Sequence, residues 1–143
     1  MRFITPVLAL GLLFSGCAVP KLDSDLQANE IARVVASEAE KQGVRPALAL
    51  AVARYESQLD PFAMSPSGAV GVMQIMPSTW RGMRCTGFIT DAQDNARCGL
   101  SYLAQGLRVG GEAYALARYH AGPAGARSPT ARRYAVKVME RAR

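Results

Sequence analysis

The segment from Pro46 to Glu56 constrains the fold most, because it is apolar on almost every side. It reads P-A-L-A-L-A-V-A-R-Y-E, beginning with a proline suited to a first helical turn and reaching a charged residue only at Arg54. A helix of this kind must be buried. The residues three, four and seven positions before Glu56 are alanine or valine, so little water surrounds its carboxylate. Desolvation favours the neutral acid and raises its pKa, as a proton donor near neutral pH requires.

A turn-rich region follows this helix. Residues 60–61 (D-P) and 65–68 (S-P-S-G) are turn sequences that fold the chain back over the helix end. The pattern G-V-M-Q-I-M at 71–76 predicts a short apolar helical stretch that stops at Pro77. Gln74 is its one polar side chain, and a buried amide needs hydrogen-bond partners. Sugar hydroxyl and acetamide groups would supply them, and the alternative is a tie between two loops.

Three sequence blocks occur in a characteristic order. The first is E-S-Q-L-D-P-F-A-M-S-P-S-G-A-V-G-V-M-Q-I-M-P at 56–77, followed by N-A-R-C-G-L-S-Y-L at 95–103 and A-R-Y-H-A-G-P at 117–123. Together they resemble the catalytic domain of the family 1 (soluble) lytic transglycosylases, over about residues 28 to 142. The resemblance implies an all-α fold shared with goose-type lysozyme, as a single compact helical domain with a substrate cleft.

The same resemblance assigns roles to particular residues. It makes Glu56 the single catalytic acid, and the implied substrate-binding residues of the cleft are Ser65, Gln74, Met76 and Tyr119. Met76 and Tyr119 are otherwise read as core side chains. The family usually has asparagine where this chain has His120, so we expect the hydrogen bonding there to differ. The implied reaction cleaves the β-1,4 bond between N-acetylmuramic acid and N-acetylglucosamine of peptidoglycan without water, leaving 1,6-anhydro ends and using no cofactor.

Two other functions stay open at this point. A hydrolytic muramidase on the same fold would use Asp60 or Asp94 to position water. Between Ser57 and Gly111 the only further acid is Asp91, and turn or helix-cap roles account for Asp60 and Asp91. A non-catalytic wall-binding lipoprotein is the third possibility, although a binding module has no need of a buried acid.

The N-terminus indicates export. A positive start, an apolar stretch and small residues make 1–16 a signal peptide too short to span a membrane stably. L-F-S-G-C, ending at Cys17, resembles a bacterial lipobox, which implies lipidation of Cys17, a membrane anchor and a periplasmic domain tethered to the outer membrane. The alternative is an ordinary cleaved signal peptide with an incidental cysteine. The sequence thus divides into 1–16, a lipidated N-terminus and tether at 17–26, and a catalytic domain at 27–143.

The remaining cysteines predict a disulfide. With Cys17 lipidated, Cys85 and Cys98 form an even pair in an oxidising compartment. Their bond would fix the loop after Trp80 to a helix beginning near Asp91. Two isolated cysteines and one histidine have no familiar ligand spacing, so no metal site is expected.

The other helices follow from caps and apolar periodicity. Ser24 or Asp25 is the expected cap of a helix to Lys41, and Asp91 and Ser128 are the expected caps of two later helices. Gly110-Gly111 marks a turn between apolar stretches.

The formal net charge of +6 is concentrated near the C-terminus. Such a surface suits an anionic partner, with stem-peptide carboxylates and lipid headgroups as candidates, or it is simply a solvated helix face. Nucleic acid is excluded by the compartment. No motif identifies a protein partner in cell-wall or secretion machinery.

Overall fold

The computed structural model describes residues 21–143, with side chains from Asp25 onward. Its helices in chain order are α1 (Lys21–Lys41), α2 (Pro46–Ser57), α3 (Pro77–Gly82), α4 (Ala92–Gly125) and α5 (Pro129–Arg141). No strand occurs in this part of the chain, where extended pairing is limited to two isolated bridges at 64–75. The predicted all-α class is confirmed. The signal peptide and Cys17 lie outside the described residues.

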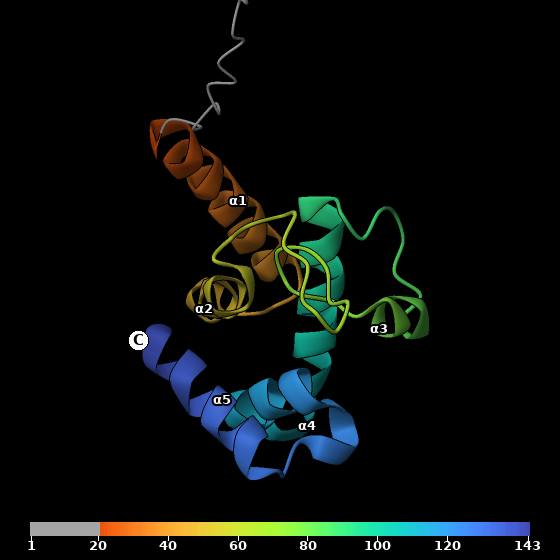
Figure 1. Cartoon of the computed structure of the whole chain (residues 1–143). Coiled ribbons are helices and arrows are strands. Elements are labelled where there is room, and N and C mark those ends of the chain that lie inside the picture. Colours follow the sequence, from red (N-terminus) through yellow and green to blue (C-terminus); the bar gives the residue numbers. More distant parts are fainter. Residues whose placement is uncertain (1–20) are drawn as a thin grey trace, which may run out of the picture.

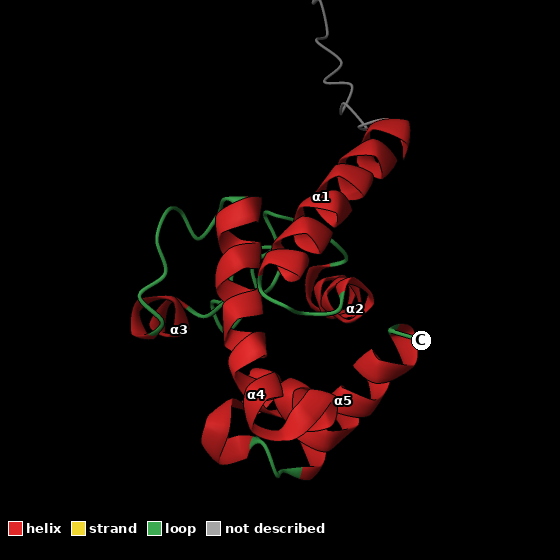
Figure 2. Cartoon of the chain, turned by 180° about the vertical axis from the view of Figure 1, so that it is seen from behind, coloured by secondary structure: helices red, strands yellow, loops and turns green. Residues whose placement is uncertain are grey.

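The long helix α4 organises the core (Figure 1). Both α1 and α5 pack against it, and α2 contacts α1 on one side and α5 on the other. At Gly110 and Gly111 the backbone leaves the helical conformation, and Gly111 has φ +71°. The second half of α4 therefore turns toward α5 (Figure 2). This arrangement surrounds α2 with apolar side chains, so Leu48, Val52 and Ala53 are fully buried.

Most helix boundaries follow the local sequence signals. Pro46 occupies the first turn of α2. The side chain of Asp91 accepts a hydrogen bond from the backbone N–H of Asp94, and Ser128 caps α5 by accepting from the backbone N–H of Ala131. Each cap satisfies an N–H group that lacks a partner within its helix.

The start of α1 differs from the expectation. The helix begins at Lys21, within the 17–26 segment expected to be a tether, rather than after a cap at Ser24 or Asp25. An acidic residue is favourable within the first turns of a helix as well as at its cap, which is why the sequence did not fix the boundary. Among the described side chains of α1 the first buried one is Ile31, so the preceding turns project from the body of the domain (Figure 1). No described helix has both the length and the apolar character needed to cross a membrane.

The helical stretch expected at 71–76 is wrong. These residues form a tight turn, in which the backbone N–H groups of Val70 and Ile75 each donate to the other's carbonyl oxygen. Gln74 has φ 49°, outside the right-handed helical region. Asn95 of α4, fully buried, accepts from the N–H of Met73 at 2.8 Å and donates to the carbonyl of Val70 at 2.9 Å. The α3 helix begins, rather than ends, at Pro77.

Candidate active site

A cavity of about 360 Å³ opens between the end of α2, the turn at 71–76, α3 and the two halves of α4. All five residues that the sequence placed in the site line this one cavity: Glu56, Ser65, Gln74, Met76 and Tyr119. The cavity is also lined by residues that were not expected there, namely Ser67, Ala69, Ile75, Thr79, Tyr102 and Gly122. His120 is a further lining residue, which places the departure from the family's usual asparagine at the site itself.

Glu56 is half-buried at the end of α2, and its neighbours on that helix leave it poorly hydrated. Ala49, Val52 and Ala53 are fully buried, as the spacing predicts. Burial raises the pKa of the Glu56 carboxyl above its usual range, and a hydrogen bond from Tyr134 partly opposes the rise. Among the described residues that line the cavity, Glu56 is the one carboxylate. The site therefore holds one acid whose proton is retained to a higher pH than usual.

Tyr134 of α5 is a further residue of the candidate site that the sequence did not lead us to expect. Its hydroxyl donates to Oε1 of Glu56 at 2.6 Å. The ring stacks on His120 with centroids 4.6 Å apart, and Tyr55 meets it edge-on at 5.0 Å. Burial, followed by the charge of Glu56, raises the pKa of Tyr134 so that the phenol stays protonated as a donor. Tyr134 and Val138 stand four residues apart and so share one helical face, and the need of a buried hydroxyl for a partner was the signal available.

Tyr119 serves both the core and the cavity. Its hydroxyl donates to the carbonyl oxygen of Met73 at 2.7 Å, which ties α4 to the turn that carries Gln74. Burial and the charge of Glu56 raise its pKa well above the usual value. Its ring lies 5.8 Å from that of Tyr102, and Arg118 sits 4.2 Å from the Tyr102 centroid. The ring, rather than the hydroxyl, is thus the part available to a ligand.

The polar residues of the turn-rich region shape the floor of the cavity. Gln74 donates from Nε2 to the carbonyl oxygens of Ala63 and Gly71, both at 3.1 Å, so its amide nitrogen ties two loops together. Ser65 accepts from the N–H of Ala69 at 2.9 Å and shares a hydrogen bond with Ser67. Met76 is 38% exposed and is a cavity wall rather than core filler.

The two acids considered for a hydrolytic mechanism are engaged elsewhere. Asp60 accepts from the backbone N–H of Phe62 at 2.8 Å, as its turn role predicts. Asp94 accepts from the N–H of Phe88 at 2.8 Å and pairs with Arg97 at 2.6 Å. The backbone bond, followed by Arg97, holds the pKa of Asp94 below its usual range. Neither residue lines the cavity. Within residues 25–143 no group of three or more histidine, cysteine or acidic side chains is placed to hold a metal.

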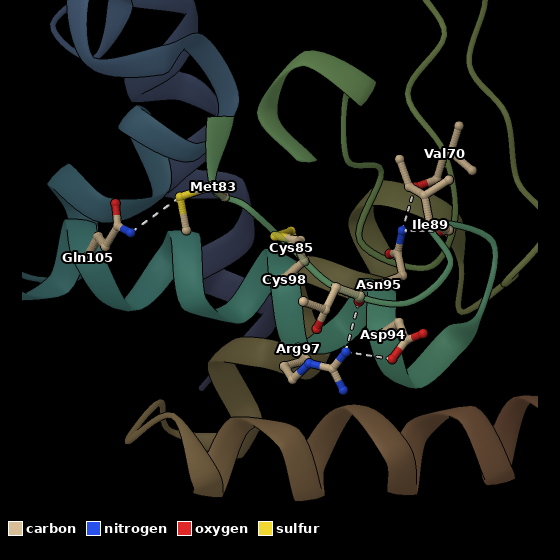
Figure 3. The surroundings of a disulfide bond; sticks show 10 residues. Val70, Met83, Cys85, Ile89, Asp94, Asn95, Arg97, Cys98 and Gln105 are labelled. Atoms are coloured by element: carbon tan, nitrogen blue, oxygen red, sulfur yellow. Dashed lines mark hydrogen bonds and ion pairs between the residues drawn. A yellow bond between two sulfur atoms is a disulfide. The ribbon is translucent and has the colours of Figure 1, made fainter. Parts of the chain in front are cut away.

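The expected disulfide between Cys85 and Cys98 is present and joins the loop after α3 to α4 (Figure 3). Cys98 is buried in the core, and Cys85 packs against it. The sequence interval between the two cysteines is 13 residues.

The model of the transglycosylase SLT domain family matches residues 33–140. The chain belongs to this family. The membrane-bound lytic murein transglycosylase C of Serratia proteamaculans is 32% identical over 125 residues, covering 78% of this chain and 31% of that protein. The soluble lytic murein transglycosylase of Escherichia coli K12 is 37% identical over 86 residues, covering 52% of this chain and 13% of that protein.

Solved structures of the family have the same fold. An inactive mutant of the lytic transglycosylase Slt from Pseudomonas aeruginosa superposes with a TM-score of 0.66 and 25% identity, over 77% of this chain and 23% of that one. The 70-kDa soluble lytic transglycosylase of Escherichia coli gives 0.66 at 23% identity, with the same coverage. This chain therefore spans less than a third of the length of these relatives.

Proposed function

We propose that this protein is a peptidoglycan lytic transglycosylase with Glu56 as its one catalytic acid. The observation that carries the proposal is a cavity with a single carboxylate, whose pKa is raised by burial and whose ionised form is hydrogen-bonded by Tyr134. Membership of the transglycosylase SLT family supports the substrate class. The substrate is the β-1,4 link between N-acetylmuramic acid and N-acetylglucosamine.

One carboxyl group suffices for a two-step proton transfer. As acid, Glu56 protonates the glycosidic oxygen; as base, it takes the proton of the muramic C6 hydroxyl while that oxygen attacks C1. The ring closes as a 1,6-anhydro sugar and no water is consumed. The substrate's own acetamide stabilises the positive charge at C1, as in substrate-assisted glycosidases, so a second enzyme carboxylate is not needed. Between the two steps, the Tyr134 hydroxyl stabilises the carboxylate of Glu56.

The other lining residues would hold the sugars. Ser65, Gln74, Met76 and Tyr119 offer hydroxyl, amide, thioether and aromatic surface around the acid. We assign them to substrate binding, with Tyr119 acting through its ring because its hydroxyl is engaged by Met73.

The proposed location is the cell envelope. Similarity to membrane-bound lytic murein transglycosylases supports a membrane-anchored enzyme. We propose a lipid anchor at Cys17, a periplasmic domain comprising 27–143 and retention at the outer membrane. The presence of the Cys85–Cys98 disulfide agrees with an oxidising compartment.

Mass analysis of digested peptidoglycan sacculi tests the proposal directly. Wild-type protein should release fragments with 1,6-anhydro ends, and Glu56→Gln should lower turnover by roughly 10²- to 10⁴-fold while staying folded, because the amide cannot donate the proton. Asp60→Asn is the matched control, since its carboxylate bonds only the backbone of its own turn. Reducing ends, together with a comparable loss in Asp94→Asn, would favour a muramidase. Absence of cleavage by folded wild-type protein would leave a wall-binding module.

A further inference from the structure

One wall of the cavity is weakly held by packing. Met76 and Thr79, at the start of α3, line the cavity. No residue of α3 is fully buried, and its inward contact is made by the half-buried ring of Trp80. Both overall views show α3 at the edge of the molecule, outside the first half of α4 (Figures 1 and 2). A segment with so little buried surface opens easily.

The first ties along the segment that follows α3 lead to α4 (Figure 3). Nearest to the helix, Gln105 donates from Nε2 to the sulfur of Met83 at 3.2 Å, and sulfur is a weak acceptor. Three residues after the helix, Cys85 is bonded covalently to Cys98. Beyond it, Arg97 donates to the carbonyl of Thr86 at 3.0 Å from a partly exposed position. Of these three contacts, the disulfide is the one that hydrogen bonds to water cannot replace.

Another part of the cavity wall is built on α4 itself. Tyr102, one turn after Cys98, and Tyr119, on the second half of the helix, both line it. A bond from Cys85 to Cys98 therefore fixes the α3 wall relative to the aromatic wall, while Glu56 is held separately by α2 and Tyr134.

We infer that the Cys85–Cys98 disulfide positions the α3 wall, so that the affinity of the cavity for glycan depends on it while the acid chemistry at Glu56 does not. The inference rests on the proposed function for its ligand, a peptidoglycan strand. Opening the bond leaves the helical core in place and frees Met76 and Thr79 to move away from the sugar.

The single tryptophan makes the wall observable without any substrate. Trp80 is the one tryptophan in the sequence and lies in α3. On reduction with dithiothreitol, which becomes a cyclic disulfide as Cys85 and Cys98 become thiols, tryptophan emission should shift to the red. Amide hydrogen exchange should accelerate in 77–86 and stay unchanged in α2, and far-ultraviolet circular dichroism at 25 °C should be retained.

Kinetics on soluble, uncross-linked peptidoglycan strands give the functional measurement. The reduced protein should show a KM raised at least several-fold with kcat nearly unchanged, and reoxidation should restore the original KM. The Cys85→Ser/Cys98→Ser double variant should have the same KM and kcat as the reduced protein, and dithiothreitol should not change them. If that variant does not fold, reduction of the folded wild type still decides the matter.

Three results would overturn the inference. One is unchanged emission and exchange at 77–86 after complete reduction. Another is accelerated exchange throughout the protein, which would mean that the bond stabilises the whole fold. The third is an unchanged KM in the reduced enzyme. If α3 loosens but neither form cleaves strands, the positioning role stands and the proposed function fails.

Discussion

Replacing Gly99 by alanine tests one close packing contact between α4 and the floor of the cavity. A methyl group at this buried position would lie 2.8 Å from Cβ of Met73, 2.9 Å from the hydroxyl oxygen of Tyr119 and 3.0 Å from Cδ1 of Ile75. Real Cβ atoms do not approach neighbours so closely, so at least two of these groups must move. The Tyr119 hydroxyl cannot shift freely, because it donates to the carbonyl of Met73 at 2.7 Å.

The expected cost follows from these distances. Overpacking a well-packed core costs about 1–3 kcal/mol, and loss of the Tyr119 hydrogen bond adds on the order of 1 kcal/mol. Alanine is more favourable than glycine within a helix, which offsets roughly 0.5–1 kcal/mol of this loss in stability. A net loss of about 1–3 kcal/mol should lower Tm by roughly 4–12 °C in a domain of this size.

Thermal unfolding followed by circular dichroism measures this shift, with Gly82→Ala as the control. A Cβ at Gly82 meets nothing within 4 Å and the residue lies in helix α3, so its Tm should stay the same or rise slightly. Weaker glycan binding by Gly99→Ala should accompany the loss, because Tyr119 lines the cavity. Equal Tm values for the two variants would refute the close packing inferred for Gly99.

Three further outcomes concern the acid and its aromatic neighbours. Tyr134→Phe removes the bond that lowers the pKa of Glu56, so the alkaline limb of the kcat/KM profile should move to higher pH; an unchanged limb would contradict this. The pKa of Glu56 is higher in the folded than in the unfolded state. Its contribution to the free energy of unfolding is therefore fully present below the unfolded pKa and is lost as pH rises through the folded pKa. Glu56→Gln should therefore be more stable than wild type at pH 8 and similar at pH 4, as Tm measured at both pH values will show. His120→Ala should lower kcat/KM by about two- to tenfold through loss of the stack on Tyr134, and His120→Phe should lose less. Equal losses would mean that the imidazole acts through its nitrogen atoms.

Local spacing was sufficient to predict the features that depend on one helix. The burial around Glu56 and the direction of its pKa shift follow from the residues one and two turns earlier, because a helix places them on one face. Helix caps such as Asp91 and Ser128 could also be predicted from the sequence, since their hydrogen-bond partners lie three residues away.

Features that depend on contacts between residues distant in sequence could not be predicted in this way. The 71–76 stretch has a helical composition, but Asn95 satisfies the backbone of Val70 and Met73 from α4 and stabilises a turn instead. A periodic pattern contains no information about such a partner. The bond between Glu56 and Tyr134 joins residues 78 positions apart, and nothing near either residue specifies the other.

That long separation gives the site a built-in order of assembly. Glu56 belongs to α2 and Tyr134 to α5, so a nascent chain carries its acid well before it carries the acid's partner. Until α5 docks, α2 also lacks one of the two helices that pack against it. Under the proposed function, a chain in which α5 has not yet docked would hold its catalytic acid without the Tyr134 hydroxyl. Removal of α5 by a protease should therefore abolish activity, so that under the same proposal cleavage of peptidoglycan depends on the docking of α5.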